Sequence, residues 1–280
     1  EYKANNPNAD IIRLGIGDVT QPLPPAVIQA MHEAVDEMAN AETFRGYGPE
    51  QGYVFLRQAI AQHDYKALGC DIEADEVFVS DGAKSDTANF TDLFGKGNII
   101  GISNPVYPVY LDSNVLAGHS GLQTSEGYEN IVFLDCLPEN DFKPQIPEKR
   151  LDIVYLCSPN NPTGTVFHKR EWEDFLRSVP GRILILLDEA YIDFVEDPRC
   201  PRGRDYLGSH KNLLVIRTFS KAYGLAGLRI GYGLTSVEVA DFMNRVRQPF
   251  NVNALALAGA LGALKDETFY RQTLTLIRKE

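Results

Sequence analysis

Five short apolar runs that end in polar residues constrain the fold of this chain more than any other feature. The runs occupy residues 77–79, 98–102, 153–157, 183–187 and 213–217. They are apolar almost throughout rather than alternating, which is typical of strands covered on both faces. Longer helical patterns lie between or before them, including residues 24–39 and 54–68. The pattern therefore predicts an α/β fold with a mostly parallel central sheet between helices.

The composition argues against several other classes of protein. The 280 residues carry 27 Lys and Arg against 38 Asp and Glu, a formal net charge of −11, which is unsuited to binding nucleic acid. No apolar run approaches the roughly 20 residues of a membrane span, and residues 1–6 are too polar for a signal peptide. The 4 cysteines and 5 histidines show no metal-ligand spacing. We expect a cytoplasmic protein with no metal ion, nucleic acid or membrane partner.

Polar residues follow three of the predicted strands where those strands end. Asn161, Asp188 and Lys221 come after the runs at 153–157, 183–187 and 213–217. Open parallel sheets bind ligands at the carboxyl ends of their strands, so these side chains are candidates for one site. Each also has an ordinary structural interpretation, because Asp commonly caps a helix, Asn-Pro commonly forms a turn and Lys is usually exposed.

The residues around Lys221 have the composition of a phosphate site. Thr218 and Ser220 precede the lysine and Arg229 follows it eight positions later. Hydroxyls and a guanidinium together bind phosphate, and a lysine beside them suits covalent binding of a phosphorylated aldehyde. A helix beginning at Gly82-Ala83-Lys84-Ser85 predicts a second anion-binding element. Tyr107 lies between two prolines and could offer a ring face for stacking, although tyrosines more often belong to a core.

The order of three motifs in this chain resembles the signature of the fold type I pyridoxal-phosphate aminotransferases of class I and II. The motifs are Asn161-Pro162-Thr163-Gly164, Asp188 with Tyr191, and Ser220-Lys221 with Arg229. The resemblance implies a large domain with a mostly parallel central sheet, and a smaller α/β domain. It divides the chain into an N-terminal segment of the small domain (1–40), a cofactor-binding large domain (41–264) and the start of a connecting helix (265–280). Because the helical pattern runs up to residue 280, we expect a truncated small domain.

The finer resemblance is divided between two families. Residues 11 to about 170 resemble LL-diaminopimelate aminotransferase. The matching stretches are Leu14-Gly15-Ile16-Gly17-Asp18-Val19-Thr20, Gly46-Tyr47-Gly48-Pro49-Glu50-Gln51-Gly52-Tyr53 and Ser80-Asp81-Gly82-Ala83-Lys84. From about residue 180 onward the chain resembles histidinol-phosphate aminotransferase. The matching stretches there are Asp188-Glu189-Ala190-Tyr191-Ile192-Asp193-Phe194, residues 217–229 and Arg247-Gln248-Pro249-Phe250-Asn251-Val252-Asn253.

Four functions remain open on this resemblance. The main expectation is amino transfer between LL-2,6-diaminopimelate and 2-oxoglutarate, in lysine biosynthesis. The alternative is histidinol-phosphate aminotransferase, in histidine biosynthesis. The third, of another class, is a truncated or hybrid chain that binds pyridoxal phosphate without turnover. A lyase or decarboxylase on the same fold is a weaker fourth, because fold does not determine chemistry.

The resemblance also implies roles for individual residues. Lys221 would hold the cofactor covalently and then act as base and acid, Asp188 would pair with the pyridine nitrogen, and Tyr191 would contact the ring oxygen. The implied cofactor-binding residues are Ala83, Lys84, Tyr107, Asn161, Asp188, Tyr191, Thr218, Ser220, Lys221 and Arg229. The implied substrate-binding residues are Gly17, Tyr47, Lys84, Tyr107, Asn161 and Asn251. A homodimer is implied, with Tyr47 donated by the neighbouring subunit. The late arginine that grips the substrate carboxylate in the family has no counterpart in this chain.

Overall fold

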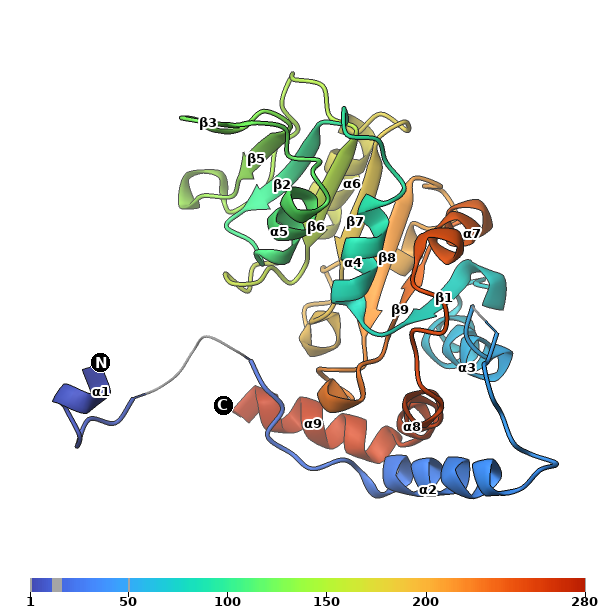
Figure 1. The fold of residues 1–280 in the computed structure, drawn as a ribbon. Helices are drawn as coiled ribbons and strands as arrows, with labels where there is room; N and C mark the ends of the chain where they lie inside the picture. The colour runs from blue at the N-terminus through green and yellow to red at the C-terminus, as the bar shows by residue number, and fades with distance from the viewer. Residues whose placement is uncertain (1, 12–16, 50, 280) are drawn as a thin grey trace.

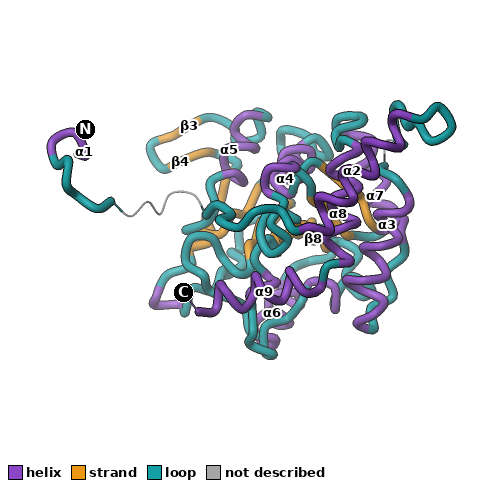
Figure 2. Tube along the Cα trace, turned by 90° about the horizontal axis from the view of Figure 1, so that it is seen from below, coloured by secondary structure: helices purple, strands orange, loops and turns teal. Residues whose placement is uncertain are grey.

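The protein is described by a computed structural model that covers residues 2–11, 17–49 and 51–279. The start of the first quoted motif, Leu14-Gly15-Ile16, and Glu50 of the second lie outside these described residues. The short helix α1 (Tyr2–Asn5) stands apart from the rest of the chain in the ribbon view of Figure 1 and in the tube view of Figure 2.

The core of the fold is a seven-stranded sheet in the order β1-β9-β8-β7-β6-β2-β5. The five adjacent strands β8, β7, β6, β2 and β5 run parallel, whereas β9 is antiparallel to both β8 and β1. The predicted α/β fold with a mostly parallel sheet is confirmed. The strands are β1 (Val77–Ser80), β2 (Ile100–Asn104), β5 (Ile131–Asp135), β6 (Ile153–Cys157), β7 (Leu184–Asp188), β8 (Leu213–Thr218) and β9 (Gly231–Leu234), and a separate pair joins β3 (Gln123–Thr124) to β4 (Gly127–Tyr128).

Two hydrophobic clusters, one on each face, explain why the central strands are apolar throughout. Along β6, Val154 belongs to one cluster and Tyr155 to the other, and both side chains are fully buried. Successive residues of a strand point to opposite faces, so a strand covered on both sides has no polar position. The register pairs Cys157 with Asp188 and Asp188 with Ile216. The carboxyl ends of β6, β7 and β8 therefore lie side by side.

Helices cover both faces of the sheet (Figures 1 and 2). Buried residues of α4, α5 and α7 pack into one cluster, and buried residues of α3, α6 and α8 pack into the other. The helices are α2 (Pro25–Ala39), α3 (Val54–Ile60), α4 (Ala83–Thr91), α5 (Val109–Leu116), α6 (Lys169–Ser178), α7 (Val237–Val246), α8 (Ala254–Lys265) and α9 (Glu267–Lys279). No helix among the described residues has the length and apolar character needed to span a membrane.

Two helical predictions differ from the structure in detail. The pattern at 54–68 predicts one helix, but α3 passes into a π-helix (Ala61–Tyr65) and a 3₁₀ turn (Lys66–Leu68) before Gly69, where φ is +82°. The C-terminal pattern is divided at Asp266, whose carboxylate accepts a hydrogen bond from the Phe269 N–H and begins α9.

Helix α2 packs against α8 at the lower end of the molecule in Figure 1. A Cβ at Gly262 would lie 2.8 Å from the carbonyl oxygen of Ala26, so the small residue permits the close approach. The sequence assigns α2 to a segment of the small domain and α8 to the large domain. The domain boundaries at 40 and 264 stay a prediction.

Candidate active site

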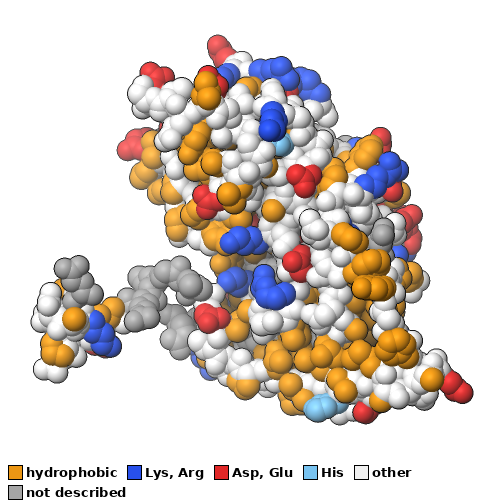
Figure 3. All heavy atoms as spheres, viewed as in Figure 1, with side chains coloured by type: hydrophobic (Ala, Val, Ile, Leu, Met, Phe, Trp, Pro, Cys, Tyr) orange, Lys and Arg blue, Asp and Glu red, His pale blue; other side chains and the backbone are white. Residues whose placement is uncertain are grey.

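A cavity of about 390 Å³ lies at the carboxyl edge of the sheet. On the face shown in Figure 3, Lys and Arg side chains gather at the waist of the molecule, between its upper and lower parts. The cavity brings together all but two of the site residues named from the sequence: Gly17, Ala83, Lys84, Tyr107, Asn161, Asp188, Tyr191, Thr218, Ser220, Lys221 and Arg229. The exceptions are Tyr47 and Asn251.

Asp188 is the buried carboxyl group of the cavity. Asp188 is the last residue of β7, and it is only 6% exposed. The Tyr110 hydroxyl donates a 2.7 Å hydrogen bond to its Oδ2, and the Ala190 N–H donates one of 2.9 Å to its Oδ1. Burial raises the pKa of Asp188, while these two donors act in the opposite direction. A carboxylate held in this way can stabilise a cationic ring nitrogen in the cavity.

Lys221 follows β8, and its amine lies in the same cavity. The Lys221 Nζ donates a 2.7 Å hydrogen bond to the carbonyl oxygen of Gly17 and lies 5.3 Å from the centre of the Tyr191 ring. Partial burial lowers the pKa of Lys221, and the nearby Asp18 carboxylate opposes that effect. A lowered pKa leaves more of the amine unprotonated and nucleophilic near neutral pH.

Polar side chains on two further loops line the cavity. Asn161 follows β6, and its Nδ2 donates a 3.4 Å hydrogen bond to the Tyr191 hydroxyl. Burial raises the pKa of Tyr191, so the phenol stays protonated and can donate to an oxygen anion. Tyr107 follows β2, and its ring meets the Tyr110 ring edge to face with centroids 6.2 Å apart. Tyr107 also lines the cavity, as a stacking residue must.

The end of the cavity formed by Arg229 and the start of α4 suits an anion. Helix α4 begins at Ala83, where its first N–H groups carry the positive end of the helix dipole. The Arg229 Nη2 lies 3.2 Å from the position that a Cβ on Gly82 would take. Thr218 and Ser220 add hydroxyls from the end of β8. The two elements that the sequence predicts separately as anion sites therefore line one cavity.

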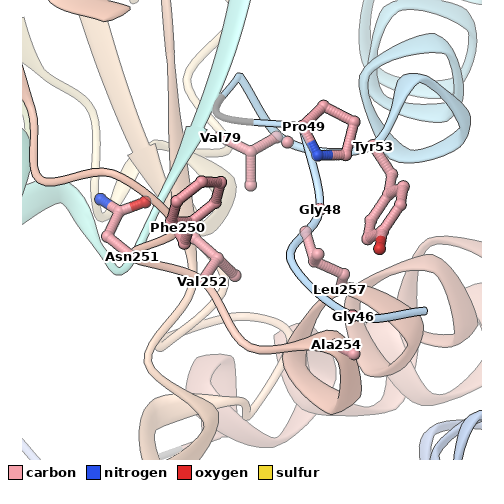
Figure 4. Close-up of a pocket in the computed structure, with 11 residues that line it drawn as sticks. Gly46, Gly48, Pro49, Tyr53, Val79, Phe250, Asn251, Val252, Ala254 and Leu257 are labelled. Atoms are coloured by element: carbon pink, nitrogen blue, oxygen red, sulfur yellow. The ribbon is translucent and has the colours of Figure 1, made fainter. Parts of the chain in front are cut away.

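Tyr47 and Asn251 lie outside this cavity. Figure 4 shows a smaller cavity, of about 50 Å³, with Phe250 and Asn251 on one side and Pro49 and Tyr53 on the other. The Asn251 Nδ2 donates to Asp81 Oδ1 at 3.1 Å. Tyr47 is 89% exposed, and its ring centroid lies 4.8 Å from that of Phe250. Their role in a shared site stays a prediction.

Among the cavity residues that sequence reasoning did not name as site residues are three with polar or thiol side chains: Asp18, Tyr110 and Cys157. Tyr110 comes three positions after Tyr107, but nothing local indicates that its hydroxyl reaches Asp188, 78 residues further along the chain. Among the described residues, no cluster of three or more His, Cys, Asp or Glu could hold a metal ion.

The comparison with protein families agrees with this geometry. Residues 9–280 match the family described as aminotransferase class I and II, and the chain belongs to this family.

Among curated relatives, the LL-diaminopimelate aminotransferase of Phocaeicola vulgatus is 48% identical over 253 residues, which is 89% of this chain and 62% of the relative. That of Methanosphaera stadtmanae is 49% identical over 244 residues, 85% of this chain and 59% of the relative. The chain thus spans about three fifths of the length of these relatives.

Among solved structures, the L,L-diaminopimelate aminotransferase from Chlamydomonas reinhardtii superimposes with a TM-score of 0.85 and 32% identity, covering 99% of this chain and 72% of that one. The histidinol-phosphate aminotransferase from Sinorhizobium meliloti, in complex with pyridoxal-5'-phosphate, has a TM-score of 0.75 and 24% identity, covering 92% and 65% of the two chains. The latter similarity shows the fold alone.

Proposed function

We propose that the cavity binds pyridoxal 5'-phosphate. The residues fit the group, because a buried carboxylate, a lysine amine and an anion-binding helix terminus with an arginine all line one space. Asp188 would face the pyridine nitrogen, and Tyr191 with Asn161 would face the ring oxygen. Tyr107 would stack on the ring. Ala83, Lys84, Thr218, Ser220 and Arg229 would hold the phosphate.

When bound, this cofactor supplies an aldehyde that a lysine amine can bind and a ring that withdraws electrons from the substrate. Lys221 would provide the amine and then take up and return the proton that moves during amino transfer. Asp188 would keep a proton at the ring nitrogen, since an ionised carboxylate in a buried site favours a cationic partner. The Tyr191 hydroxyl would donate to the ring oxygen and thereby hold the ring in place.

The reaction we propose is amino transfer between LL-2,6-diaminopimelate and 2-oxoglutarate. The observation that carries this choice is the extent of the similarity to LL-diaminopimelate aminotransferases. An alignment of 253 residues must run well past residue 180, into the part of the chain that resembles histidinol-phosphate aminotransferase. The similarity therefore includes both halves of the candidate site.

We further propose a homodimer in which Tyr47 reaches the neighbouring subunit's cavity. Tyr47 does not line the cavity of its own chain, and the side chain is almost wholly exposed beside Phe250. Hydrophobic side chains cover much of the lower part of the face in Figure 3, over α2 and α8. Exposed apolar surface of this kind commonly marks a contact with another chain.

The first experiment tests the cofactor. We expect the purified chain to gain visible absorbance when pyridoxal phosphate is added, and Lys221→Ala to lose that absorbance. Lys84 is the matched control, because its amine belongs to the same cavity. Lys84→Ala should retain the absorbance with weaker binding. A wild-type chain without the absorbance, or an unchanged band in Lys221→Ala, would contradict the proposal.

The second experiment tests the substrate. LL-diaminopimelate and histidinol phosphate are each supplied with 2-oxoglutarate, and glutamate formation is measured. We expect glutamate from LL-diaminopimelate. Glutamate from histidinol phosphate alone would overturn the substrate assignment in favour of the alternative. A chain that binds the cofactor and yields no glutamate from either substrate would instead support binding without turnover.

A further inference from the structure

A buried ionic cluster lies on the opposite side of the strand ends from the cavity. The Arg217 Nη2 contacts Asp193 Oδ1 at 2.6 Å, and its Nη1 lies 3.7 Å from Glu189 Oε2. All three side chains are less than one tenth exposed. Arg217 precedes Thr218 and Glu189 follows Asp188, and adjacent residues of a strand point to opposite faces. The cluster therefore restrains the backbone next to Asp188 and Thr218, two residues that line the cavity.

Helix α9 contacts this cluster through Tyr270. The Tyr270 hydroxyl donates a 2.9 Å hydrogen bond to Asp193 Oδ1, the same oxygen that contacts Arg217. Asp193 comes two residues after Tyr191. The contact thus joins α9 to the loop that follows β7.

The same part of α9 contacts the turn that presents Lys221. The Tyr270 ring lies over Tyr223 with centroids 5.0 Å apart and planes 30° apart. The Phe269 ring comes within 3.5 Å of the position that a Cβ on Gly224 would take. This turn is closed by a 3.0 Å hydrogen bond from the Gly224 N–H to the Lys221 carbonyl, and φ at Gly224 is +73°. In Figure 1, α9 lies along the lower end of the molecule, beneath the segment that follows β8.

We propose that Tyr270 is a positioning residue for the cofactor site, which rests on the function proposed above. Its hydroxyl holds Asp193 and its ring holds Tyr223, so α9 restrains both loops, one carrying Tyr191 and the other Lys221. Tyr270 does not line the cavity. It acts by limiting the conformations of the loops, and a partly buried hydrogen bond to a charged group together with a ring contact is strong enough to do so.

The test compares Tyr270→Phe with the wild-type chain and with Tyr206→Phe. The control removes another half-buried hydroxyl, which donates to Glu173 Oε1 at 3.4 Å and lies outside the cavity lining. Amide hydrogen exchange of residues 219–225 is measured without cofactor. Pyridoxal phosphate is then titrated by visible absorbance, and the pH midpoint of that absorbance is recorded.

We expect exchange of residues 219–225 to rise roughly 2- to 30-fold in Tyr270→Phe, the range seen for residues that couple two sites, with β6 unaffected. The cofactor should bind several-fold more weakly, and the pH midpoint should move by more than about 0.3 unit, a twofold change in proton affinity. Tyr206→Phe should leave all three quantities at their wild-type values.

Equal behaviour of the two variants would overturn the proposal. Should Tyr270→Phe not fold, Phe269→Leu tests whether α9 restrains the lysine turn from the neighbouring residue, because the Phe269 ring lies beside Gly224 and the variant leaves the ionic cluster intact. A wild-type chain that binds no cofactor would refute the proposed function, whereas the exchange measurement would still decide whether Tyr270 restrains the lysine turn.

Discussion

At the scale of single residues, the sequence predicted most of the cavity because its key side chains follow apolar runs. Asn161, Asp188 and Lys221 each come after a strand whose end can be identified locally. Parallel strands bring such ends together at one edge of the sheet, so residues that are far apart in the sequence form one site. Tyr110 lies on α5 and follows no apolar strand, so nothing local predicted that it belongs to the site. Its hydroxyl reaches Asp188 only because α5 packs close to the end of β7.

The Tyr110 hydroxyl leads to the first prediction. Tyr110→Phe removes the donor to Asp188 Oδ2, so the pKa of Asp188 should rise further and its charge should become a weaker partner for a ring nitrogen. A hydrogen bond to a charged group contributes about 1.5–3 kcal/mol, so pyridoxal phosphate should bind roughly tenfold or more weakly. The measurement is a titration followed by visible absorbance.

Tyr155→Phe is the control for that titration. The Tyr155 ring stacks on Tyr110 with centroids 5.5 Å apart, and the residue is also fully buried, but it does not line the cavity. Its cofactor affinity should equal that of the wild-type chain. Equal affinities in the two variants would show that Tyr110 does not support the Asp188 charge.

At the scale of elements, the strands that were predicted are short apolar runs, whereas β9, the neighbour of β8 that was missed, contains glycine. Strand β9 reads Gly231-Tyr232-Gly233-Leu234, which has no apolar run. A Cβ at Gly233 would lie 2.1 Å from the Phe78 ring on β1, so the strand needs glycine to pack there. Glycine in a strand often marks such a close approach, which only the neighbouring strand reveals.

Gly231 provides a second prediction, for stability. A Cβ there would lie 2.7 Å from the Arg217 carbonyl oxygen and 2.9 Å from the Ala83 nitrogen, both backbone atoms that cannot move away easily. Gly231→Ala should therefore lower the free energy of unfolding by about 1–3 kcal/mol, the usual cost of overpacking. Gly227→Ala is the control, because no atom lies within 4 Å of its added Cβ. Urea denaturation measures both, and a variant at Gly231 as stable as that at Gly227 would contradict the structure.

The first turn of α4 gives a third prediction, on pH. Burial raises the pKa of Asp86 to about 7, opposed by the Ser80 hydroxyl and the Arg247 charge. A carboxyl whose pKa is higher in the folded state binds its proton more tightly there. Its contribution to stability is complete below about pH 4 and is lost as the pH rises to about 7.

Asp86→Asn lacks this titration. The free energy of unfolding of the wild-type chain, relative to that of the variant, should therefore fall between pH 4 and pH 7 and be constant above that range. Urea denaturation at several pH values tests this. A relative stability that rises over the same interval would mean that Asp86 is ionised in the folded protein at low pH.

At the scale of the whole molecule, the family resemblance implied that Tyr47 lies away from the cavity of its own chain and serves a neighbouring subunit, but no local pattern in the sequence showed it. Local patterns cannot reveal such a separation, because it depends on where a long loop crosses the surface. Tyr47 is exposed beside Phe250, and Asn251 lies by the smaller cavity (Figure 4). A second subunit would explain why a residue expected at the substrate is found on the surface.

The shared site gives the last prediction, a complementation experiment. Tyr47→Ser should damage the neighbouring subunit's cavity, and Lys221→Ala should damage its own. In a mixed dimer with two-fold symmetry, one cavity then carries both defects and the other carries none. Random mixing of equal amounts should therefore restore about a quarter of the wild-type cavities, because half of the dimers are mixed and each has one intact site. Cofactor absorbance with bound substrate analogue, compared with each variant alone, measures the restored fraction. If Tyr47 served its own chain, every mixed dimer would have two damaged cavities, and mixing would restore nothing.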